Sequence, residues 1–506
     1  MKIVFIAISV ESLAIEFLSS FLKKNNHDVD VVFDPSVFSS EVIRIEKLAN
    51  FFDTKKEIVK QILEKKPDII GFSVFTLNYQ RTLEIAREIR KYNQTCPIIF
   101  GGIHTISVPE AVIKEKCVDI VCVGEGEEAL VELLDSISND KINYEIKNLW
   151  FKKDGKIIKN PRRPLIENLD ELPFPDKDLF YKIYPEFVKD YYTISSRGCP
   201  FACSYCANNV LHNVYRGLGK VIRRRSPENI IEELVLAKKK YSSNKITFVD
   251  DVFVQDLNWL EKFVSAYKEK INLPYLMLTH PRFVTPKIAE LLADSGCYLL
   301  CFGIQSASWE TRKTILNRFE TNQEIENAAK NCHAVNLEFS IDHIFNIPGE
   351  GIKEQEEALV FYNQLRPTII NSYQLQYLPK TEIINKAIEK GVLKKSMIKE
   401  IEEGLTSTSL VFGFGNKDKF NPDLIYSNFQ FFFMLLPILP KRVMDLIIKK
   451  KLYLMRFRIP IVFSFVLKFS ITIFKNRVGV YMRILKHILY FARFNLSIKS
   501  KYKNQN

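Results

Sequence analysis

Short apolar runs alternate with amphipathic segments over the first 140 residues. Runs of strand length include KIVFIAI, DVDVVF, DIIGFSVF, PIIFGG and DIVCVG. Between them, segments such as ESLAIEFLSSFLKKNNH and RTLEIAREIRKY place apolar residues at helical intervals. Strands that alternate with helices predict a doubly wound parallel sheet, and such sheets bind ligands at the carboxyl ends of their strands. We therefore predict a Rossmann-like α/β domain over residues 1–140.

Small residues stand where the predicted strands of this domain end. Ser73 lies at the end of one strand, Gly101 and Gly102 follow the next, and Gly124 and Gly126 come after the last. Glycine at a strand end lets the backbone come close to a bulky ligand, although each glycine taken alone also fits a tight turn. Together they indicate a ligand site along one edge of the sheet.

The rest of the chain divides into three segments. Prolines and charges interrupt any hydrophobic period over residues 141–185, which indicates a linker. Over residues 186–400, apolar runs are followed by polar or glycine turns and then by amphipathic segments such as TPKIAELLADSG. That repeat predicts a partial β/α (TIM-like) barrel with its site on the loops at the strand ends. We expect a helical, hydrophobic and basic region over residues 401–506.

The composition is that of a folded protein with one unusual segment. Of the 506 residues, 47% are hydrophobic and 26% are charged, which argues against a disordered or fibrous chain. Residues 440–506 hold sixteen Lys or Arg and one acid, so they carry +15, and the remainder carries −2 of the net +13. A basic tail on a nearly neutral body predicts contact with a local anionic surface and no nucleic-acid partner.

The basic C-terminal region admits two interpretations. Its dense Phe, Leu and Ile fit a helical cap packed on the barrel mouth, and its interleaved Lys and Arg fit an amphipathic surface lying on anionic lipid. No window reaches about 18 uncharged apolar residues, because residues 459–474 contain Pro460 and Lys468. The N-terminal sequence does not read as a signal peptide. We expect a cytoplasmic protein, peripheral at the inner face of the membrane if the lipid interpretation holds.

Three of the nine cysteines fall within eight residues, at Cys199, Cys203 and Cys206. Directly after a short strand, this spacing lets one loop present three thiolates to one face of an iron–sulfur cluster, with one iron left open. A zinc site is the alternative, with His212 six residues on, but structural zinc ligands usually come as two spaced pairs and the chain has no second CxxC. An odd cysteine total and this grouping favour a reducing compartment.

The string RGCPFACSYCAN resembles the motif of the radical S-adenosylmethionine (SAM) enzymes. The resemblance extends over about residues 173–391 and includes LPFPD, RRRSPENIIEEL, FVDDVF, CFGIQSAS, HIFNIPGE and LQYLPKTEIINKAIEKG. Over residues 1–140, the order GFSVF, GGIHTISVPE and DIVCVGEGEEAL resembles the cobalamin-binding domain that precedes many of these enzymes. The resemblance implies three cofactors, which are a 4Fe–4S cluster, S-adenosyl-L-methionine and cobalamin.

The resemblance also implies roles for the residues of the cysteine motif. In that family three cysteines hold the cluster and SAM chelates the open iron. An electron from the cluster cleaves SAM to give a 5′-deoxyadenosyl radical, so the protein supplies ligation, orientation and shielding. By resemblance, Cys199, Cys203 and Cys206 are the metal ligands, and Tyr205 is the aromatic residue that packs near the adenine.

Three further residues correspond to SAM-binding positions of the family. Asp250 and Asp251 end the second barrel strand, where paired carboxylates suit the methionine ammonium group, although a helix N-cap and a solvated acid explain them equally. Gln305 stands where the commonest form of the family has glutamate, and its amide can hydrogen-bond a ribose hydroxyl.

In the cobalamin-binding domain, the family lines the pocket for the nucleotide tail with a serine and paired glycines. These correspond to Ser73, Gly101 and Gly102. The loop after the first strand, SVESLAIEF, has no histidine to coordinate cobalt from below, which implies His-off cobalamin. A lone histidine near the glycines, His104, is more consistent with a solvated or hydrogen-bonded side chain than with a ligand.

The resemblance implies an enzyme that cleaves SAM reductively, most often to methylate an unactivated carbon of a small-molecule substrate. Flavodoxin or ferredoxin is the implied electron donor, and the tail is consistent with a hydrophobic substrate. Cyclisation or rearrangement on the same scaffold is one alternative, and a non-catalytic zinc- or cobalamin-binding module is another. A tRNA-modifying enzyme is disfavoured, because the basic residues lie in the tail instead of lining the barrel.

Three other cysteines raise the question of a second cluster. Cys297, Cys301 and Cys332 lie in apolar strand or helix surroundings without close pairing. Cysteine is among the most often buried residue types, so we expect buried thiols rather than cluster ligands.

Overall fold

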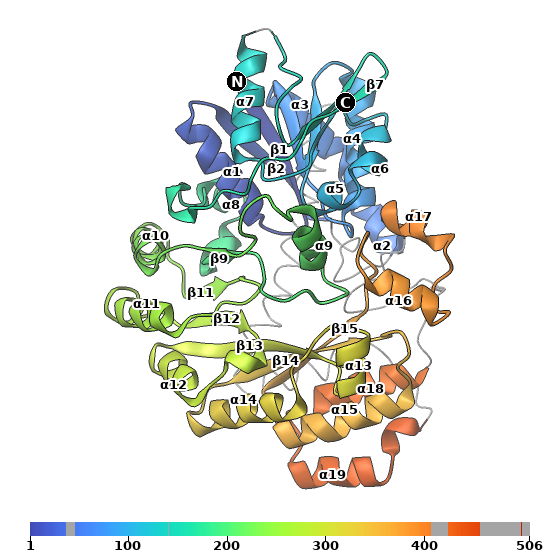
Figure 1. The fold of residues 1–506 in the computed structure, drawn as a ribbon. Coiled ribbons are helices and arrows are strands. Elements are labelled where there is room, and N and C mark those ends of the chain that lie inside the picture. The colour runs from blue at the N-terminus through green and yellow to red at the C-terminus, as the bar shows by residue number, and fades with distance from the viewer. Residues whose placement is uncertain (37–45, 140, 406–423, 456–496, 498–506) are drawn as a thin grey trace. The chain divides into compact units, whose positions relative to one another are not determined.

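The computed structural model describes residues 1–36, 46–139, 141–405, 424–455 and 497 (Figure 1). These residues form two compact units. The first unit combines the chain up to Asn244 with the segment that starts at Tyr377, and the second combines the chain from Lys245 to Gln376 with the described C-terminal helices. The range predicted as one barrel domain is therefore shared between the two units.

The first unit is built on a seven-stranded sheet with the strand order β2-β1-β3-β4-β5-β6-β7. Strands β1 to β5 are parallel, and β6 and β7 are each antiparallel to the strand before them. The strands are β1 (Lys2–Ile8), β2 (Asp28–Asp34), β3 (Ile69–Ser73), β4 (Ile98–Gly101), β5 (Ile120–Cys122), β6 (Leu149–Lys153) and β7 (Lys156–Lys159). The order of β1 to β5 is that of doubly wound sheets, which confirms the Rossmann-like prediction.

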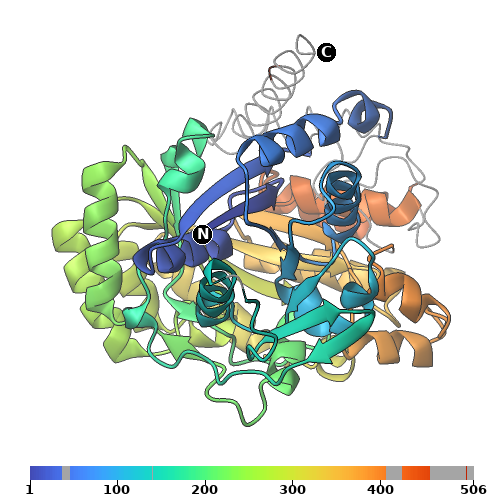
Figure 2. The ribbon, with the colours of Figure 1, turned by 90° about the horizontal axis from the view of Figure 1, so that it is seen from above.

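Helices cover both faces of this sheet, and Figure 2 shows the blue strands β1 and β2 between helices on either side. On one face, α3, α4 and α6 pack on a core that includes Val4, Ile6, Ile70 and Phe100. Helices α1 and α7 contact each other. Burial on both faces explains why the strands read as continuous apolar runs. The helices are α1 (Leu13–Lys24), α2 (Glu46–Phe51), α3 (Lys55–Glu64), α4 (Tyr79–Tyr92), α5 (Ile103–Ser107), α6 (Pro109–Lys114) and α7 (Glu127–Ser138).

Strands β6 and β7 lie in the segment predicted as a linker. They are joined by Asp154 and Gly155, both with positive φ values, 49° and 72°. Leu149, Trp150 and Phe151 of β6 are buried and extend the core of the first domain. An Asp-Gly pair between apolar residues is typical of a tight hairpin, and it was the sequence signal for these two strands. The first sheet therefore continues about twenty residues beyond its predicted boundary.

The end of the predicted linker is anchored on the first domain by a buried ion cluster. Lys177 Nζ lies 2.6 Å from Glu11 Oε1 and 2.7 Å from Glu16 Oε2, and each of the three side chains is at most 5% exposed. Burial raises the pKa of Glu16 well above its ordinary value, although the Lys177 ammonium group opposes that rise. Removing one member of a buried charged group leaves the others unpaired, so this cluster fixes the segment that leads into the cysteine motif.

The remainder of the first unit surrounds the cysteine motif. Strands β9 and β10 pair antiparallel, with Arg197 opposite Arg223. The motif forms the loop between β9 and α9. The elements are η1 (Leu169–Glu171), α8 (Asp178–Tyr181), η2 (Pro185–Lys189), β8 (Asp190–Thr193), β9 (Ser196–Arg197), α9 (Ala207–Val214), β10 (Arg223–Arg224), α10 (Pro227–Lys240), α16 (Ile383–Glu389) and α17 (Met397–Glu402).

The second unit contains five parallel strands that neighbour one another in chain order, β11 to β15. Each of the first four strands is followed by at least one helix, which is the repeat of a β/α barrel, so the predicted partial barrel is confirmed. The elements are β11 (Lys245–Phe248), α11 (Leu257–Lys270), β12 (Tyr275–Thr279), η3 (Pro281–Phe283), α12 (Pro286–Asp294), β13 (Cys297–Gln305), α13 (Trp309–Thr314), α14 (Asn322–Ala334), β14 (Phe339–Phe345), α15 (Ile352–Leu365) and β15 (Ile369–Gln374).

The described part of the C-terminal region is a folded cap on the second unit. It comprises α18 (Leu424–Leu435), α19 (Lys441–Lys449) and η4 (Leu452–Leu454), and both helices contact α15. Phe429, Phe433 and Met444 are fully buried, and Asn363 Nδ2 donates to Asp445 Oδ1 at 2.7 Å. These residues are therefore folded against the second unit, and their position at the barrel mouth stays a prediction. Within the described part of the chain, no helix has both the length and the apolar character to cross a bilayer.

The lipid interpretation now concerns residues 456–496 and 498–506, which lie outside the described residues. This segment contains eleven Lys or Arg. Since each basic residue near an anionic leaflet contributes about 1 kcal/mol, we expect the protein to sediment with anionic vesicles and to be released by salt. A variant with these eleven residues changed to glutamine should stay in the supernatant, and neutral vesicles serve as the control. Equal sedimentation of variant and wild type would show that the tail does not bind lipid.

Candidate functional site

A cavity of about 270 Å³ lies at the carboxyl ends of the parallel strands in the first unit. Ser73, Gly101 and Gly102, the three residues predicted from the strand ends, all line it. The apolar side chains of Phe17 and Leu130, from α1 and α7, also line it. The structure thus brings these predicted residues together at one site, as expected for a doubly wound sheet.

Part of the cavity wall is bare backbone. Gly102 has a φ of 107°, and a Cβ atom there would lie 2.6 Å from the Val74 carbonyl oxygen. At Gly71, a Cβ atom would lie 2.7 Å from the ring of Phe5. Only glycine fits at Gly102, because an L side chain meets both an unfavourable φ and main-chain atoms. Tight packing of Gly102 against Val74 therefore fixes this part of the cavity wall.

His104 is a structural residue. Its side chain is fully buried, its Nδ1 lies 3.1 Å from Thr76 Oγ1, and its ring packs 4.2 Å from that of Tyr79. Burial lowers the pKa of His104 to about 4, so the ring is neutral at physiological pH. His104 is therefore hydrogen-bonded and not solvated, and its having no ligand role stays a prediction.

The cysteine motif is held by hydrogen bonds from the helix that follows it. His212 Nε2 donates to the Cys199 carbonyl oxygen at 2.8 Å, and Asn209 Nδ2 donates to the Ala202 carbonyl oxygen at 3.1 Å. A bond from the Ile383 amide to the Ser204 carbonyl oxygen ties the loop to α16. His212 therefore positions the loop through the main chain, a role that its sequence position did not reveal.

The three motif cysteines share this one loop, but their chemical settings differ. Cys203 is 7% exposed, while Cys199 and Cys206 are half-buried. Cys206 is the N-cap of α9, and a helix N-terminus favours negative charge nearby, which suits a thiolate. Among the described residues, no three His, Cys, Asp or Glu side chains are already gathered around a metal position. Ligation by these cysteines therefore stays a prediction from their spacing.

The other predicted SAM-binding residues lie on separate elements. Tyr205 is half-buried in the motif loop of the first unit. In the second unit, Asp250 is 1% exposed and Asp251 is exposed, and the N-cap of α11 is Asp256. The N-cap explanation for the aspartate pair is therefore wrong. Gln305 ends β13 with a φ of 70°, which turns its amide back over Gly303. The SAM contacts of these residues stay predictions.

Cys297 and Cys332 are buried, and Cys301 is half-buried. Burial raises the pKa of Cys301 to about 12 and that of Cys332 to about 12, so these thiols stay protonated. Neutral thiols are poor metal ligands. The expectation of buried thiols is consistent with this environment.

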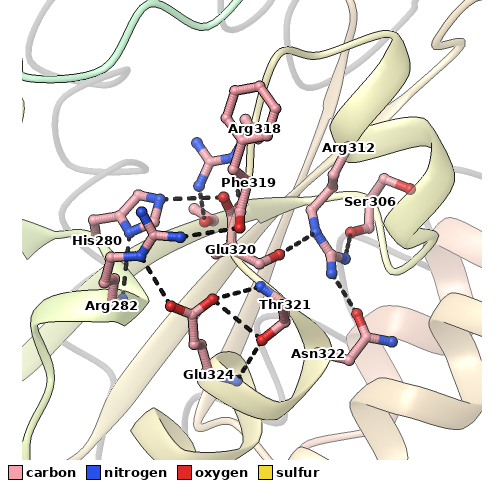
Figure 3. Close-up of polar contacts among 11 residues, drawn as sticks. His280, Arg282, Ser306, Arg312, Arg318, Phe319, Glu320, Thr321, Asn322 and Glu324 are labelled. Atoms are coloured by element: carbon pink, nitrogen blue, oxygen red, sulfur yellow. Dashed lines mark hydrogen bonds and ion pairs between the residues drawn. The ribbon is translucent and has the colours of Figure 1, made fainter.

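A network that the sequence did not indicate joins the ends of β12 and β13 (Figure 3). Glu320, 1% exposed, lies 3.3 Å from His280 Nε2 and accepts from Arg318 Nε at 2.6 Å. Arg318 Nη2 donates to the Gly303 carbonyl oxygen at 2.8 Å. Burial alone would raise the pKa of Glu320, but the bond from His280 and the Arg318 guanidinium bring it to about 2. The network fixes the strand end that carries Gln305.

Changing Glu320 to glutamine should lower the free energy of unfolding by about 3 to 5 kcal/mol, because the Arg318 guanidinium would be left buried without its counter-ion. Urea unfolding measures the loss. Glu326 to glutamine is the control, since Glu326 is one-third exposed and lies 3.9 Å from Lys330, where an ion pair contributes about 0.5 kcal/mol. Equal losses in the two variants would mean that the network does not stabilise the unit.

Two family models match the chain in chain order. The B12 binding domain matches residues 6–134, and the Radical SAM superfamily matches residues 193–361. The first match contains Ser73, Gly101 and Gly102, and the second contains the cysteine motif and strands β11 to β14.

The chain is also similar to curated proteins and to solved structures. The chain is 29% identical to the uncharacterized methyltransferase PH0819 of Pyrococcus horikoshii, over 70% of this chain and 73% of that protein. It is 20% identical to the cytidylyl-2-hydroxyethylphosphonate methyltransferase of Streptomyces wedmorensis, over 75% and 78%. The structure of the cobalamin-dependent SAM radical enzyme OxsB with aqua-cobalamin and SAM bound has a TM-score of 0.65 at 16% identity, covering 99% of this chain and 80% of OxsB. The radical SAM methyltransferase TsrM from Kitasatospora setae has a TM-score of 0.60 at 16% identity, covering 77% and 76%.

The fold and the two matched domains define the class. The chain belongs to the radical SAM enzymes that carry a cobalamin-binding domain. It is a cobalamin-dependent radical SAM enzyme, and its cofactors are cobalamin, SAM and a 4Fe–4S cluster. The sequence-based prediction of the family and of its cofactors is confirmed.

The residues that line the cavity lead to a prediction about the axial ligand of cobalt in bound cobalamin. Within the described chain, no histidine lines the cavity, and the loop after β1 contains none. We therefore expect the cob(II)alamin form to show no histidine-derived nitrogen superhyperfine splitting in its electron paramagnetic resonance spectrum. Splitting from one axial nitrogen that changes when the histidines of the protein are labelled with nitrogen-15 would contradict His-off binding, and free cob(II)alamin in its base-on form is the control for splitting from the cofactor's own base.

Proposed function

We propose that this enzyme methylates an unactivated carbon of a small-molecule substrate. When bound, the cluster and SAM supply a 5′-deoxyadenosyl radical, and cobalamin supplies the methyl group. Relatives support methyl transfer, because they include the PH0819 methyltransferase and the bacteriochlorophyllide d C-8(2)-methyltransferase of Chlorobaculum tepidum, which is 23% identical over 58% of this chain and 62% of that protein.

The observation that carries the proposal is that one unit holds both the backbone-walled cavity and the loop with three thiols. The cavity lies at the carboxyl ends of the parallel strands and has Ser73, Gly101 and Gly102 in its lining, which fits the ligand site of a doubly wound sheet. The thiol loop fits a cluster, because thiolates are the ligands of iron–sulfur sites and three of them leave one iron for SAM. In this proposal Ser73, Gly101 and Gly102 hold cobalamin, and the motif cysteines hold the cluster.

Within the second unit, we propose that Gln305 and Asp250 orient SAM. Gln305 is fixed by a left-handed turn at the end of β13, next to the Arg318–Glu320 network. Asp250 offers a buried carboxyl group at the end of β11. Asp251, which is exposed, has the weaker structural support for this role.

The test is a reaction with SAM labelled in its methyl group, using anaerobically reconstituted enzyme and a cell extract as the source of substrate. Methyl transfer predicts a labelled product, with 5′-deoxyadenosine and S-adenosylhomocysteine formed in equal amounts. Formation of neither compound by enzyme with a full iron and sulfide content would contradict the proposal. Dithionite and a flavodoxin or ferredoxin system are compared as electron sources.

Cyclisation is the second candidate. The anaerobic magnesium-protoporphyrin IX monomethyl ester cyclase of Rubrivivax gelatinosus is 22% identical over 66% of this chain and 60% of that protein. The same assay separates the two reactions. Formation of 5′-deoxyadenosine together with an unlabelled product would favour cyclisation or rearrangement over methyl transfer.

A further inference from the structure

One side chain belongs to both the cavity and the cysteine loop. Arg197 lines the cavity and stands two residues before Cys199. Its Nη1 donates to Glu125 Oε1 at 2.8 Å and its Nη2 donates to Glu127 Oε1 at 2.7 Å. Both carboxylates also line the cavity, Glu125 from the loop between β5 and α7 and Glu127 from the first residue of α7. Arg197 and the two carboxylates that it contacts therefore all face a ligand in the cavity.

A second arginine makes Glu125 the centre of the arrangement. Arg223 Nη1 lies 2.9 Å from Glu125 Oε1 and also donates to the Ile166 carbonyl oxygen at 2.7 Å. Arg197 and Arg223 face each other across the β9–β10 pair, where like charges repel unless an anion lies between them. Burial opposes ionisation of Glu125, but the guanidinium groups of Arg197 and Arg223 hold its pKa below the ordinary value. Glu125 thus holds the two-stranded ribbon to the cavity loop.

The backbone between Arg197 and Cys199, the first cysteine of the motif, is tightly packed. Gly198 has a φ of 87°, and a Cβ atom there would overlap the Val221 carbonyl group. The backbone of Gly198 therefore lies against Val221, two residues before β10, and Cys199 is the next residue. Because Arg197, Gly198 and Cys199 are consecutive and Gly198 is packed against Val221, we expect a displacement of β9 to reach the first thiol of the loop.

We propose that Arg197 is a positioning residue that couples occupancy of the cobalamin cavity to the geometry of the cluster loop. The inference rests on the proposed function in that the cavity holds cobalamin and the motif cysteines hold the cluster. Coupling between two sites is reciprocal, so a formed cluster should tighten cobalamin binding by the same factor by which cobalamin tightens the cluster loop.

The experiment measures the affinity for hydroxocobalamin by absorbance, once with apo-protein and once with protein reconstituted with iron and sulfide. Coupling between sites typically changes affinity 5- to 150-fold, so we expect the reconstituted wild type to bind hydroxocobalamin at least fivefold more tightly. In Arg197→Gln, the two affinities should agree within about twofold. For Arg197→Lys, the ratio of the affinity of the reconstituted protein to that of the apo-protein should be intermediate. One ammonium group cannot reproduce the contacts of a guanidinium group with two carboxylates.

Arg163→Gln is the matched control. Arg163 pairs with Glu128 and Glu132 on α7, next to the cavity loop, and its side chain is 17% exposed, close to the 19% of Arg197. Among the described residues its guanidinium group donates only to α7, so this variant should keep the wild-type ratio of the two affinities. A loss of the ratio in both variants would mean that general loosening of the domain, and not Arg197, is responsible.

Further outcomes decide the proposal. An equal affinity of apo- and reconstituted wild type would overturn the coupling while leaving the proposed function intact. Failure of both forms to bind hydroxocobalamin would instead contradict the proposed function. If Arg197→Gln does not fold, Glu127→Gln is used in its place, because it changes only one of the two carboxylates that Arg197 contacts. A wild-type ratio of the two affinities in both Glu127→Gln and Arg197→Lys would refute the role of Arg197.

Discussion

Replacing Cys203 by alanine should abolish reductive cleavage of SAM. A cluster left with two protein thiolates is poorly held, since this class of site already has one ligand fewer than a cluster held by protein alone. The measurement is 5′-deoxyadenosine formation after anaerobic reconstitution, together with iron and sulfide content. The same loss is expected for Cys199 and Cys206, because the three stand on one loop.

Cys96 to alanine is the control for burial. Cys96 and Cys203 are both 7% exposed, and both lie in the first unit. The control variant therefore suffers a comparable loss of packing without losing a cluster ligand. It should retain the wild-type iron content and form 5′-deoxyadenosine. Normal product formation by the Cys203 variant with a full iron load would show that the motif does not hold the catalytic cluster.

The Gly102 to alanine variant should bind cobalamin at least tenfold more weakly. A side chain at a φ of 107° costs about 1 to 2 kcal/mol, and its Cβ atom would also lie 2.6 Å from the Val74 carbonyl oxygen. The backbone has to move to relieve that contact, and it forms the cavity wall. Each tenfold in affinity corresponds to about 1.4 kcal/mol. Absorbance titration with hydroxocobalamin gives the affinity.

Gly155 to alanine separates the backbone penalty from the effect on the cavity. Gly155 has a φ of 72° in the β6–β7 turn, and a Cβ atom there would meet nothing within 4 Å. This variant should unfold at a slightly lower temperature and bind cobalamin normally. If both variants bind equally well, the close approach at Gly102 has no role in cofactor binding.

Several features could be predicted from the sequence because they depend on neighbouring residues. The five parallel strands of the first sheet each correspond to one apolar run, since a strand covered by helices on both faces is apolar throughout. The cysteine loop could be recognised because its three cysteines lie within eight consecutive residues. The same reasoning placed Ser73, Gly101 and Gly102 at one edge, because parallel strands end on the same side of a sheet.

Other features were missed although a local signal was present. The β6–β7 hairpin carries an Asp-Gly turn between apolar residues, but the charges and prolines around it suggested a linker. His212 was considered as a zinc ligand because of its distance in sequence from the cysteines. Its ring instead donates to the Cys199 carbonyl oxygen, and only the path of α9 reveals that contact.

The sequence by itself determined the order of the two cofactor domains, the thiol loop and the strand-end glycines, because each is encoded in a short stretch of chain. Only the tertiary structure decided which charges meet. Arg197 and Glu125 are 72 residues apart, and His280 and Glu320 are separated by forty. Such pairs form because packing brings distant strand ends together and burial makes an unpaired charge costly, and neither condition leaves a pattern in the local sequence.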